Sequence, residues 1–115
     1  MLYKMKLNES PFERIKNGTK TIEFRLYDEK RRQVKIGDKI EFSKLPNLKE
    51  KIVVDVIELY REDTFEDLFK KLYSDEEEIN RKTKAMYEYY SIEKQKEYGV
   101  LGIKIMIREK KYGKI

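Results

Sequence analysis

The sequence predicts a small α+β domain in which about five short, mostly antiparallel strands form a β-barrel with flanking helices. Three observations support this fold class. Short segments of alternating apolar and polar residues recur along the 115-residue chain. Short loops join the middle segments, which favours antiparallel pairing. A final alternating segment follows a helical stretch and would close the barrel and remove exposed edges, although an open α+β sheet is the alternative.

The first segments predict a strand, a short helix and a glycine turn. Apolar residues alternate with lysines over residues 2–7, which predicts a strand with one buried face. A serine-proline pair begins a helix over residues 11–17, with Phe12 and Ile15 on its apolar side. Gly18 ends this helix. A helix this short is not stable alone, so its apolar side is expected to cover one end of the sheet core.

The next strand, residues 20–26, carries most of the functional argument. Its apolar residues alternate with Thr21, Glu23 and Arg25, so these three side chains are expected to share the opposite face. Lys20 stands where the chain enters the strand. An acid, a base and a hydroxyl group thus lie in one row, which is either a binding site or a solvated surface whose ion pairs contribute little.

The middle of the chain predicts a polar loop and two strands. Residues 27–33 have no useful periodicity and are expected to form a loop, with one helical turn at most. A Gly37-Asp38 turn introduces a strand over residues 39–43. Residues 51–60 form the longest run rich in β-branched residues, and apolar side chains occupy both odd- and even-numbered positions. This pattern indicates either a strand covered on both faces or a bulge that switches the inward face.

Three helices and a last strand are expected in the rest of the chain. Thr64 caps the first helix, and Ser74 begins the second, which is expected to run to about Tyr89 and to leave most of its surface in water. The third helix covers residues 92–98. Residues 100–107 alternate again and predict the final strand. The length fits a single domain over residues 1–115.

Composition excludes several function classes. The chain has no cysteine and no histidine, which removes disulfides, thiolate nucleophiles, imidazole bases and the usual zinc ligands. Carboxylates without a spaced loop do not indicate a metal site, so we predict no metal and no cofactor. No apolar run approaches the roughly 20 residues that span a bilayer, and the N-terminus lacks the apolar core of a signal peptide. We therefore expect a cytoplasmic protein without a membrane partner.

Charge is high and unevenly distributed. The chain has 27 Lys and Arg residues against 22 Asp and Glu residues, for a net charge of +5. Residues 14–44 hold ten bases and five acids, whereas residues 75–97 hold seven acids and five bases. Clustered bases are typical of a polyanion partner, because phosphates release counterions when they bind Lys and Arg. A lysine-rich surface without any partner is the alternative.

Four segments in order resemble the ASCH domain, a member of the PUA-like superfamily of small β-barrels. They are residues 11–15, 18–25, 36–40 and 98–103. The most specific is the Gly-x-Lys-x-x-Glu-x-Arg pattern of residues 18–25, with the Gly-Asp turn at the expected distance. The resemblance covers nearly the whole chain. It implies a barrel with a cleft beside the first helix and roles in RNA binding or RNA-linked chemistry; some relatives hydrolyse the amide of N4-acetylcytidine and others have been described as ribonucleases.

We therefore expect a cleft for RNA or a nucleotide-like ligand, built on Lys20, Glu23 and Arg25. Arg25 would bind a phosphate or a base edge bidentately, and Lys20 would supply a point charge. Glu23 would accept a hydrogen bond from a base amine or hold Arg25 in place. Tyrosines would offer stacking faces for unpaired bases, although core packing is the alternative for Tyr90. The predicted ligand-binding residues are Gly18, Lys20, Glu23, Arg25, Tyr27 and Tyr90.

Two other function classes stay open, so the sequence does not decide whether the protein is an enzyme. A hydrolase in the same cleft would use Lys20 and Glu23 as catalytic residues. The amidohydrolases of the resembling family have a threonine where this chain has Glu23, and a carboxylate is a poorer acyl acceptor than an alkoxide, although it can position water as a general base. The third class is a protein-interaction module using the acidic helix of residues 75–88. The oligomeric state is also left open.

Overall fold

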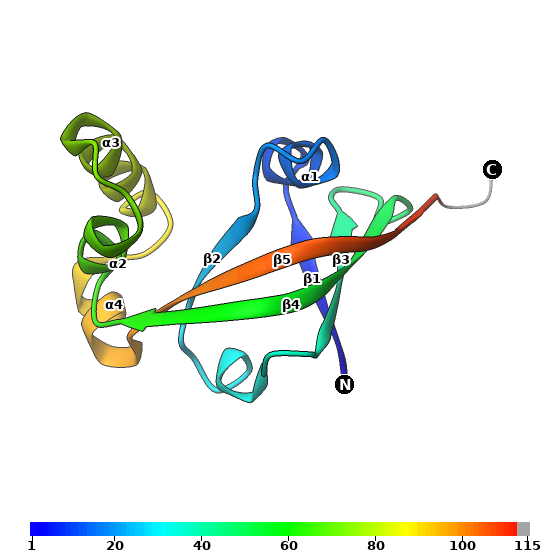
Figure 1. The fold of residues 1–115 in the computed structure, drawn as a ribbon, viewed down its shortest axis with the longest axis horizontal. Coiled ribbons are helices and arrows are strands. Elements are labelled where there is room, and N and C mark those ends of the chain that lie inside the picture. The colour runs from blue at the N-terminus through cyan, green and yellow to red at the C-terminus, as the bar shows by residue number, and fades with distance from the viewer. Residues whose placement is uncertain (113–115) are drawn as a thin grey trace. The chain divides into compact units, whose positions relative to one another are not determined.

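This computed structural model describes residues 1–112. Five strands in this part of the chain form one mixed sheet (Figure 1). The strands are β1 (Leu2–Leu7), β2 (Ile22–Leu26), β3 (Lys39–Lys44), β4 (Lys51–Glu62) and β5 (Val100–Lys111). Their order is β1-β3-β4-β5-β2, so β1 and β2 are edges and the sheet is open. The predicted α+β class with five strands is confirmed. The closed, mostly antiparallel barrel is not confirmed.

The pairing of β1 with β3 is parallel, whereas β3 pairs with β4 in the antiparallel sense. The chain between β1 and β3 passes through a helix and β2, which gives it the length that a parallel pairing requires. In the register of these strands Met5 lies opposite Phe42, and Phe42 lies opposite Ile52. Parallel pairing depends on this long connection, which is why short-loop reasoning did not predict it.

Four helices and one 3-10 turn accompany these strands within residues 1–112. They are α1 (Glu9–Lys16), η1 (Arg31–Gln33), α2 (Phe65–Leu72), α3 (Glu76–Met86) and α4 (Ile92–Tyr98). Thr64 caps α2 as predicted, since its hydroxyl accepts a hydrogen bond from the Asp67 amide at 3.2 Å. None of the helices in the described chain is long and apolar enough to cross a membrane.

The prediction that Ser74 begins the next helix is wrong. The N-cap of α3 is Asp75, whose side chain makes no capping hydrogen bond. The helix also ends at Met86, before the predicted Tyr89. Its last residues continue as a hydrogen-bonded turn, in which the Tyr90 amide donates to the Met86 carbonyl at 2.9 Å.

Contacts within the chain divide it into two compact units, which are described separately below. The first unit contains residues 1–23, residues 34–59 and the described chain from Ile103, and the second contains residues 24–33 and 60–102. The predicted site residues are divided in the same way: Gly18, Lys20 and Glu23 belong to the first unit, and Arg25, Tyr27 and Tyr90 to the second. The single domain over residues 1–115 stays a prediction.

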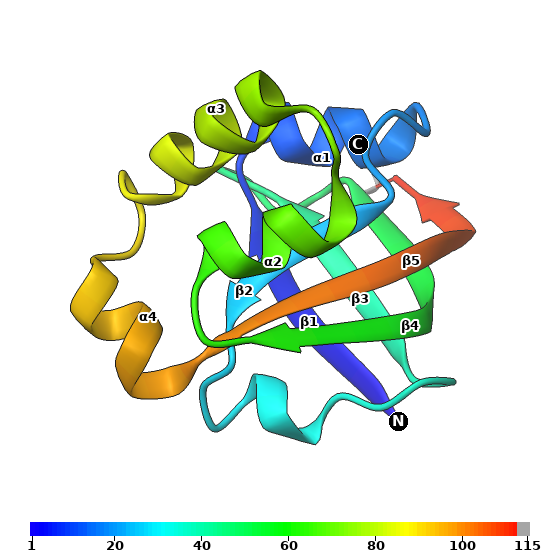
Figure 2. The same ribbon diagram turned by 60° about the vertical axis from the view of Figure 1, so that its left-hand side comes forward.

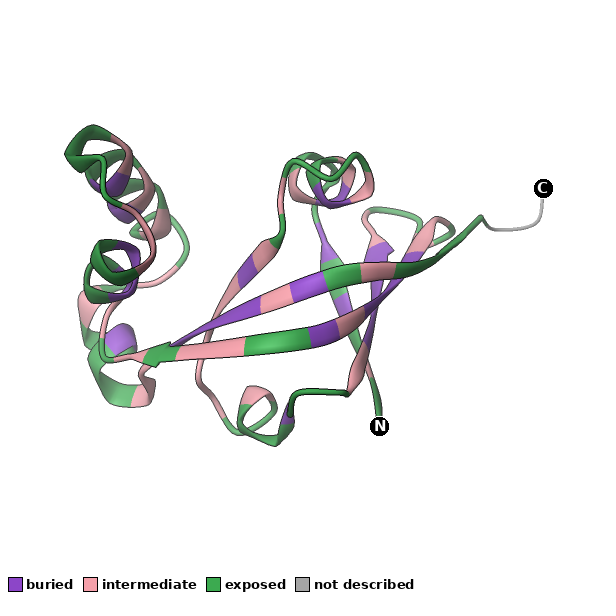
Figure 3. Cartoon of the chain, viewed as in Figure 1, coloured by how far each residue is buried: buried purple, intermediate pink, exposed green. Residues whose placement is uncertain are grey.

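The core of the first unit lies between its strands and α1. Phe12 and Ile15 are the buried residues of α1, as their spacing predicted. The cross-strand row of Met5, Phe42 and Ile52 is also buried, and Figure 3 shows the buried stretches of the strands in purple. Apolar side chains that face one another across strands stabilise the sheet, and a helix above them excludes water.

The core of the second unit is largely aromatic. Phe65 and Phe69 of α2 are buried together with Ile79 of α3, and Figure 2 shows these two helices side by side. Phe24 meets Phe69 edge to face, with ring centroids 5.0 Å apart. Tyr90 stacks on Phe65 at 5.8 Å. Such ring pairs contribute about 0.5–1.5 kcal/mol beyond the area they bury.

Candidate functional site

The turn from α1 into β2 fixes where Lys20 begins its strand. Gly18 has a positive φ of 84°, which suits glycine in a helix-ending turn. The Asn17 Oδ1 atom accepts hydrogen bonds from the Thr19 amide at 2.9 Å and from the Thr19 hydroxyl at 2.7 Å. The Lys20 amide donates to the Arg14 carbonyl at 2.9 Å. These hydrogen bonds hold the turn closed and fix the start of the segment that carries Lys20.

Lys20 and Glu23 form a buried ion pair in the first unit. The Lys20 Nζ atom lies 3.2 Å from Glu23 Oε1, and the two side chains are only 14% and 6% exposed. Glu23 as a whole residue is 5% exposed, whereas Ile22 and Phe24 on the other face of β2 are half-buried. A buried carboxylate is costly unless it is paired. Lys20 and Glu23 are therefore not a solvated surface pair.

Of the other two residues of the predicted row, Thr21 is exposed, and Arg25 belongs to the second unit. Arg25 is half-buried and lies in β2, two residues after Glu23 in the sequence. The guanidinium group has the donors needed for a phosphate or a base edge. Its role in a ligand site stays a prediction.

Tyr27, in the second unit, contacts two arginines. The Cζ atoms of Arg61 and Arg32 lie 4.2 Å and 5.2 Å from the ring centroid. Arg32 Nε also donates to the Tyr27 carbonyl at 3.1 Å, and the Tyr27 amide donates to the Gly99 carbonyl at 2.9 Å. Cation–π contacts of this kind are favourable. A nucleobase that stacked on Tyr27 would therefore have to join or replace a guanidinium group.

Tyr90 lies among the aromatic side chains of the second unit. Besides its stacking on Phe65, its carbonyl accepts a hydrogen bond from Gln95 Nε2 at 3.2 Å. The residue is half-buried and packs against the core cluster. These contacts agree with the core-packing alternative for Tyr90. Its neighbour Tyr89 is exposed.

Two depressions that the sequence did not predict lie one in each unit. The depression of the second unit has a volume of about 460 Å³, and its lining includes Lys30, Gln33 and Tyr98. The depression of the first unit, of about 480 Å³, is lined partly by Lys44 and Glu50. The lack of periodicity in residues 27–33 was the only sequence signal for the former. The latter depends on contacts between elements that are distant in sequence.

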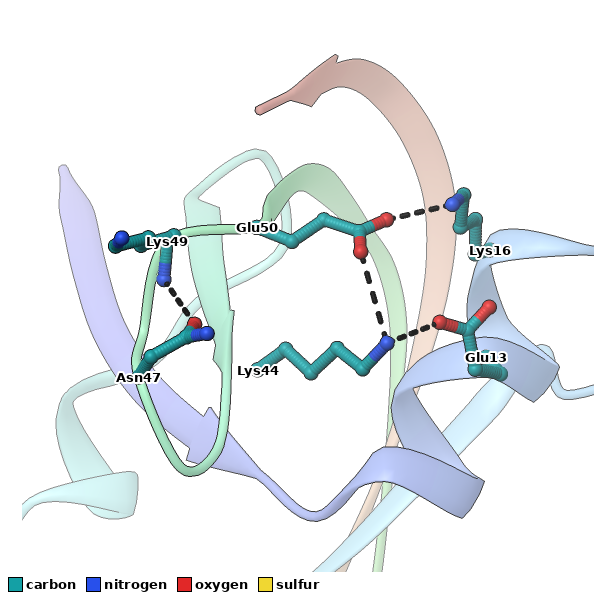
Figure 4. A network of polar contacts seen from close by, with 6 residues as sticks. All are labelled: Glu13, Lys16, Lys44, Asn47, Lys49 and Glu50. Carbon is teal, nitrogen blue, oxygen red and sulfur yellow. Dashed lines mark hydrogen bonds and ion pairs between the residues drawn. The ribbon is translucent and has the colours of Figure 1, made fainter. Parts of the chain in front are cut away.

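Next to the depression of the first unit, four charged side chains form a network (Figure 4). Lys44 Nζ lies 2.6 Å from Glu13 Oε1 and 3.6 Å from Glu50 Oε1, and Lys16 Nζ lies 2.6 Å from Glu50 Oε2. The hydrogen bond from Lys44 lowers the pKa of Glu13, and the carboxylate of Glu13 in turn raises the pKa of Lys44. The hydrogen bond to Glu50 raises the pKa of Lys16. The charges neutralise one another, which favours a structural role.

The predicted site residues Lys20, Glu23 and Arg25 carry an ammonium group, a carboxylate and a guanidinium group. An ammonium group donates three hydrogen bonds and a carboxylate only accepts them, so the Lys20–Glu23 pair can meet both a phosphate and an amine. No group of three or more carboxylates is placed to hold a metal ion within residues 1–112. The Lys20–Glu23 pair thus has the groups that bind charged and polar ligands and that general acid–base work requires.

The chain belongs to the ASCH domain family, because the model of that family matches residues 5–108. The crystal structure of hypothetical protein PH0355 is 34% identical, covers 94% of this chain and 100% of its own, and has a TM-score of 0.79. The solution NMR structure of PF0455 from Pyrococcus furiosus is 35% identical, covers 95% of this chain and 99% of its own, and has a TM-score of 0.68.

A more distant structure shows the fold alone. It is the crystal structure of a serine-to-alanine mutant of ZmASCH from Zymomonas mobilis, which is 14% identical, covers 94% of this chain and 68% of its own, and has a TM-score of 0.57. A comparison with functionally curated proteins gave no match. The resemblance inferred from the sequence pattern is thus confirmed at the level of the family.

Proposed function

We propose that this ASCH domain protein binds RNA or a nucleotide-like ligand through Lys20 and Glu23, with Arg25 as a further contact on the same strand. The observation that carries the proposal is the buried ion pair between Lys20 and Glu23. Replacing a buried ion pair by apolar side chains is often neutral or stabilising, so such a pair is weak evidence for a purely structural role. Lys20 and Glu23 are also the lysine and glutamate of the family pattern.

The groups fit the chemistry of a nucleotide. Lys20 offers an ammonium group to a phosphate, and Glu23 offers an acceptor to an exocyclic amine of a base. Arg25 supplies a second cation with the planar geometry that binds phosphate oxygens bidentately. The net charge of +5 favours association with a polyanion at low salt.

The proposal is tested by fluorescence anisotropy with a labelled single-stranded RNA at several salt concentrations. We expect binding that weakens with salt, and a Lys20→Ala variant that binds about tenfold or more weakly, which corresponds to about 1.4 kcal/mol. The matched control is Lys70→Ala, because Lys70 is an exposed lysine of α2. Its affinity should equal that of the wild type. An absence of binding at the lowest salt, or equal losses in both variants, would contradict the proposal.

A hydrolase is the second candidate, because the same contact between Lys20 and Glu23 places a carboxylate beside an ammonium group, and such a carboxylate can position water as a general base. N4-acetylcytidine and single-stranded RNA are the substrates to assay. Turnover that is lost in Lys20→Ala and Glu23→Gln, while RNA affinity persists in Glu23→Gln, would favour the enzyme. Binding without turnover of either substrate would favour the binding function.

A further inference from the structure

The outer face of the first unit's sheet carries a cluster of cations. Lys4 lies opposite Glu41, and Lys6 lies opposite Ser43, which lies opposite Lys51. Lys4 and Lys6 alternate with the buried Met5 and Leu7 of β1 and are exposed, whereas Glu41 and Ser43 on the same face of the sheet are buried. Lys39 occupies the same face of β3, opposite Asp55.

Two cations of β5 join this face through ion pairs with its acids. Arg108 Nε lies 2.9 Å from Asp55 Oδ1, and Lys111 Nζ lies 3.7 Å from Glu41 Oε2. We call this set the basic face. It consists of Lys4, Lys6, Lys39, Lys51, Arg108 and Lys111.

The acids of this region lie deeper than its cations. The Glu41 side chain is 10% exposed, whereas that of Lys111 beside it is 45% exposed. Lys51 Nζ approaches the same carboxylate to 3.9 Å, and it also donates to the Ser43 hydroxyl at 2.9 Å. The Lys51 and Lys111 side chains are 34% and 45% exposed, so both ammonium groups lie near this carboxylate while parts of both side chains meet water. Lys4, Lys6, Arg108 and Lys111 are exposed, whereas Glu41 is buried and Asp55 is half-buried, so the cations of this face meet solvent more than its two acids do.

The spacing of these cations suits an extended polyanion. Alternate residues of one strand lie about 6.7 Å apart, and neighbouring strands lie about 4.8 Å apart. Lys4 and Lys6 are alternate residues of β1, and Lys51 lies two strands away from Lys6 on the far side of Ser43, so the three cations can meet several phosphates of one grid-like path at once. The outward positions of residues 2–6, 39–43 and 51–57 carry no aromatic side chain, so the grid offers no stacking platform for a base.

We propose that the basic face is a second RNA contact, which binds the phosphate backbone of a single strand without sequence preference. The inference rests on the proposed function, because it takes RNA as the ligand. It adds a surface separate from Lys20 and Glu23, with a different task. Phosphate contacts position a nucleic acid and give salt-dependent affinity, whereas contacts with base edges give specificity.

The test compares two variants of equal charge by anisotropy with fluorescein-labelled oligouridine at a series of salt concentrations. The face variant combines Lys4→Gln, Lys6→Gln and Lys51→Gln. The control combines Lys70→Gln, Lys71→Gln and Lys84→Gln, three exposed lysines of α2 and α3. For single strands, each lost phosphate contact lowers the slope of log affinity against log salt by about 0.7, so the face variant should lose about 2. The control should keep the wild-type slope.

A double variant protects the test against misfolding. Lys51 contacts the buried carboxylate of Glu41, so its replacement can disturb the fold, whereas Lys4→Gln with Lys6→Gln leaves that contact in place. This double variant should lose about 1.4 from the slope. Circular dichroism and thermal unfolding of each variant show whether the fold is retained.

The outcomes separate this inference from the proposed function. An unchanged slope in the folded double variant, together with weak binding by Lys20→Ala, would overturn the basic face and leave the proposed function standing. No binding of oligouridine by the wild type at the lowest salt would overturn the proposed function and with it this inference. If the face variant lost binding to phosphatidylserine vesicles but kept the wild-type slope with RNA, the face would be a membrane contact instead.

Discussion

The Glu13 carboxylate of α1 lies 2.6 Å from the Lys44 ammonium of β3, and Glu50 continues this contact to Lys16. Charges thus alternate across α1 and the β3–β4 connection. The pKa of Glu13 is lowered from its ordinary value of 4.5, and the pKa values of Lys16 and Lys44 are raised from 10.5. These opposite directions make the network sensitive to pH on both sides of neutrality.

We expect the free energy of unfolding to fall in acid and in alkali. The Glu13 contribution is present above the unfolded pKa of 4.5 and is lost as pH falls through the lower folded pKa. The lysine contributions are fully present below 10.5 and are lost as pH rises through the higher folded pKa values. Urea unfolding across pH measures both changes.

The acid side can be assigned to Glu13 by substitution. In Glu13→Gln the loss of stability below pH 4.5 should be smaller than in the wild type, because the group that takes up a proton is gone. Glu93→Gln on α4, an exposed position, is the matched control and should keep the wild-type profile. Identical acid profiles for Glu13→Gln and the wild type would exclude Glu13 as the source.

Gln95 is expected to be a stabilising polar residue of the second unit. Its side chain is buried at 2% exposure, and its Oε1 atom accepts a hydrogen bond from the Phe65 amide at 3.0 Å. Gln95→Leu would leave that amide at the start of α2 unsatisfied, at a cost of about 1–3 kcal/mol. Urea unfolding measures the loss. Lys96→Ala, an exposed position on the same helix, should change stability by less than about 0.5 kcal/mol. Equal stability of the two variants would argue against the role of Gln95.

Gly99 is expected to tolerate no side chain. Its φ of 78° and ψ of 176° lie in a region that is essentially restricted to glycine. A Cβ atom there would also lie 3.4 Å from the Glu62 carbonyl oxygen. Gly99→Ala should therefore destabilise the protein by about 1–3 kcal/mol, as measured by thermal unfolding. Gly18→Ala is the comparison, since a Cβ at Gly18 meets nothing within 4 Å and only its φ opposes it. A smaller effect at Gly99 than at Gly18 would contradict this account.

Local signals in the sequence predicted the elements that depend on nearby residues. The Thr64 cap and the helix over residues 92–98 were predicted because their hydrogen bonds join residues a few positions apart. Two helix starts were predicted wrongly: α1 begins at Glu9 with Asn8 as its N-cap instead of Ser10, and the N-cap of α3 is Asp75 instead of Ser74. In each case two nearby residues both suit an N-cap. Sequence preference alone does not choose between them.

Contacts between distant residues could not be predicted in the same way. The parallel pairing of β1 with β3 depends on the path of the chain between them. For the candidate site, alternation in residues 20–26 placed Glu23 on one face of the strand and Ile22 and Phe24 on the other face. It did not tell which of the two faces is covered by the rest of the protein. Glu23 proved more buried than its apolar neighbours. Burial is a property of packing, so the pattern gave the residues of the site without their environment.

The energetic coupling of Lys20 and Glu23 is the most direct measure of their buried contact. Lys20→Met leaves a buried carboxylate without this lysine, and Glu23→Leu leaves a mostly buried ammonium group without this carboxylate. Each single variant should be destabilised by about 1–3 kcal/mol, and the double variant by less than the sum of the two, with a coupling energy of about 1 kcal/mol or more. Urea unfolding of the four proteins closes the cycle.

An exposed ion pair provides the control for this cycle. Lys70 and Glu66 lie 3.4 Å apart on α2 with side chains 62% and 50% exposed, so solvent screens their attraction. Their coupling energy should be about 0.3–0.5 kcal/mol. If the cycle at Lys20 and Glu23 gave no more than this exposed pair, the two buried charges would not depend on each other, and the observation that carries the proposed function would lose its force. A larger coupling energy would show that a ligand that displaces either group from the ion pair binds more weakly by that energy. The affinity of the site would then depend on the stability of the Lys20–Glu23 contact.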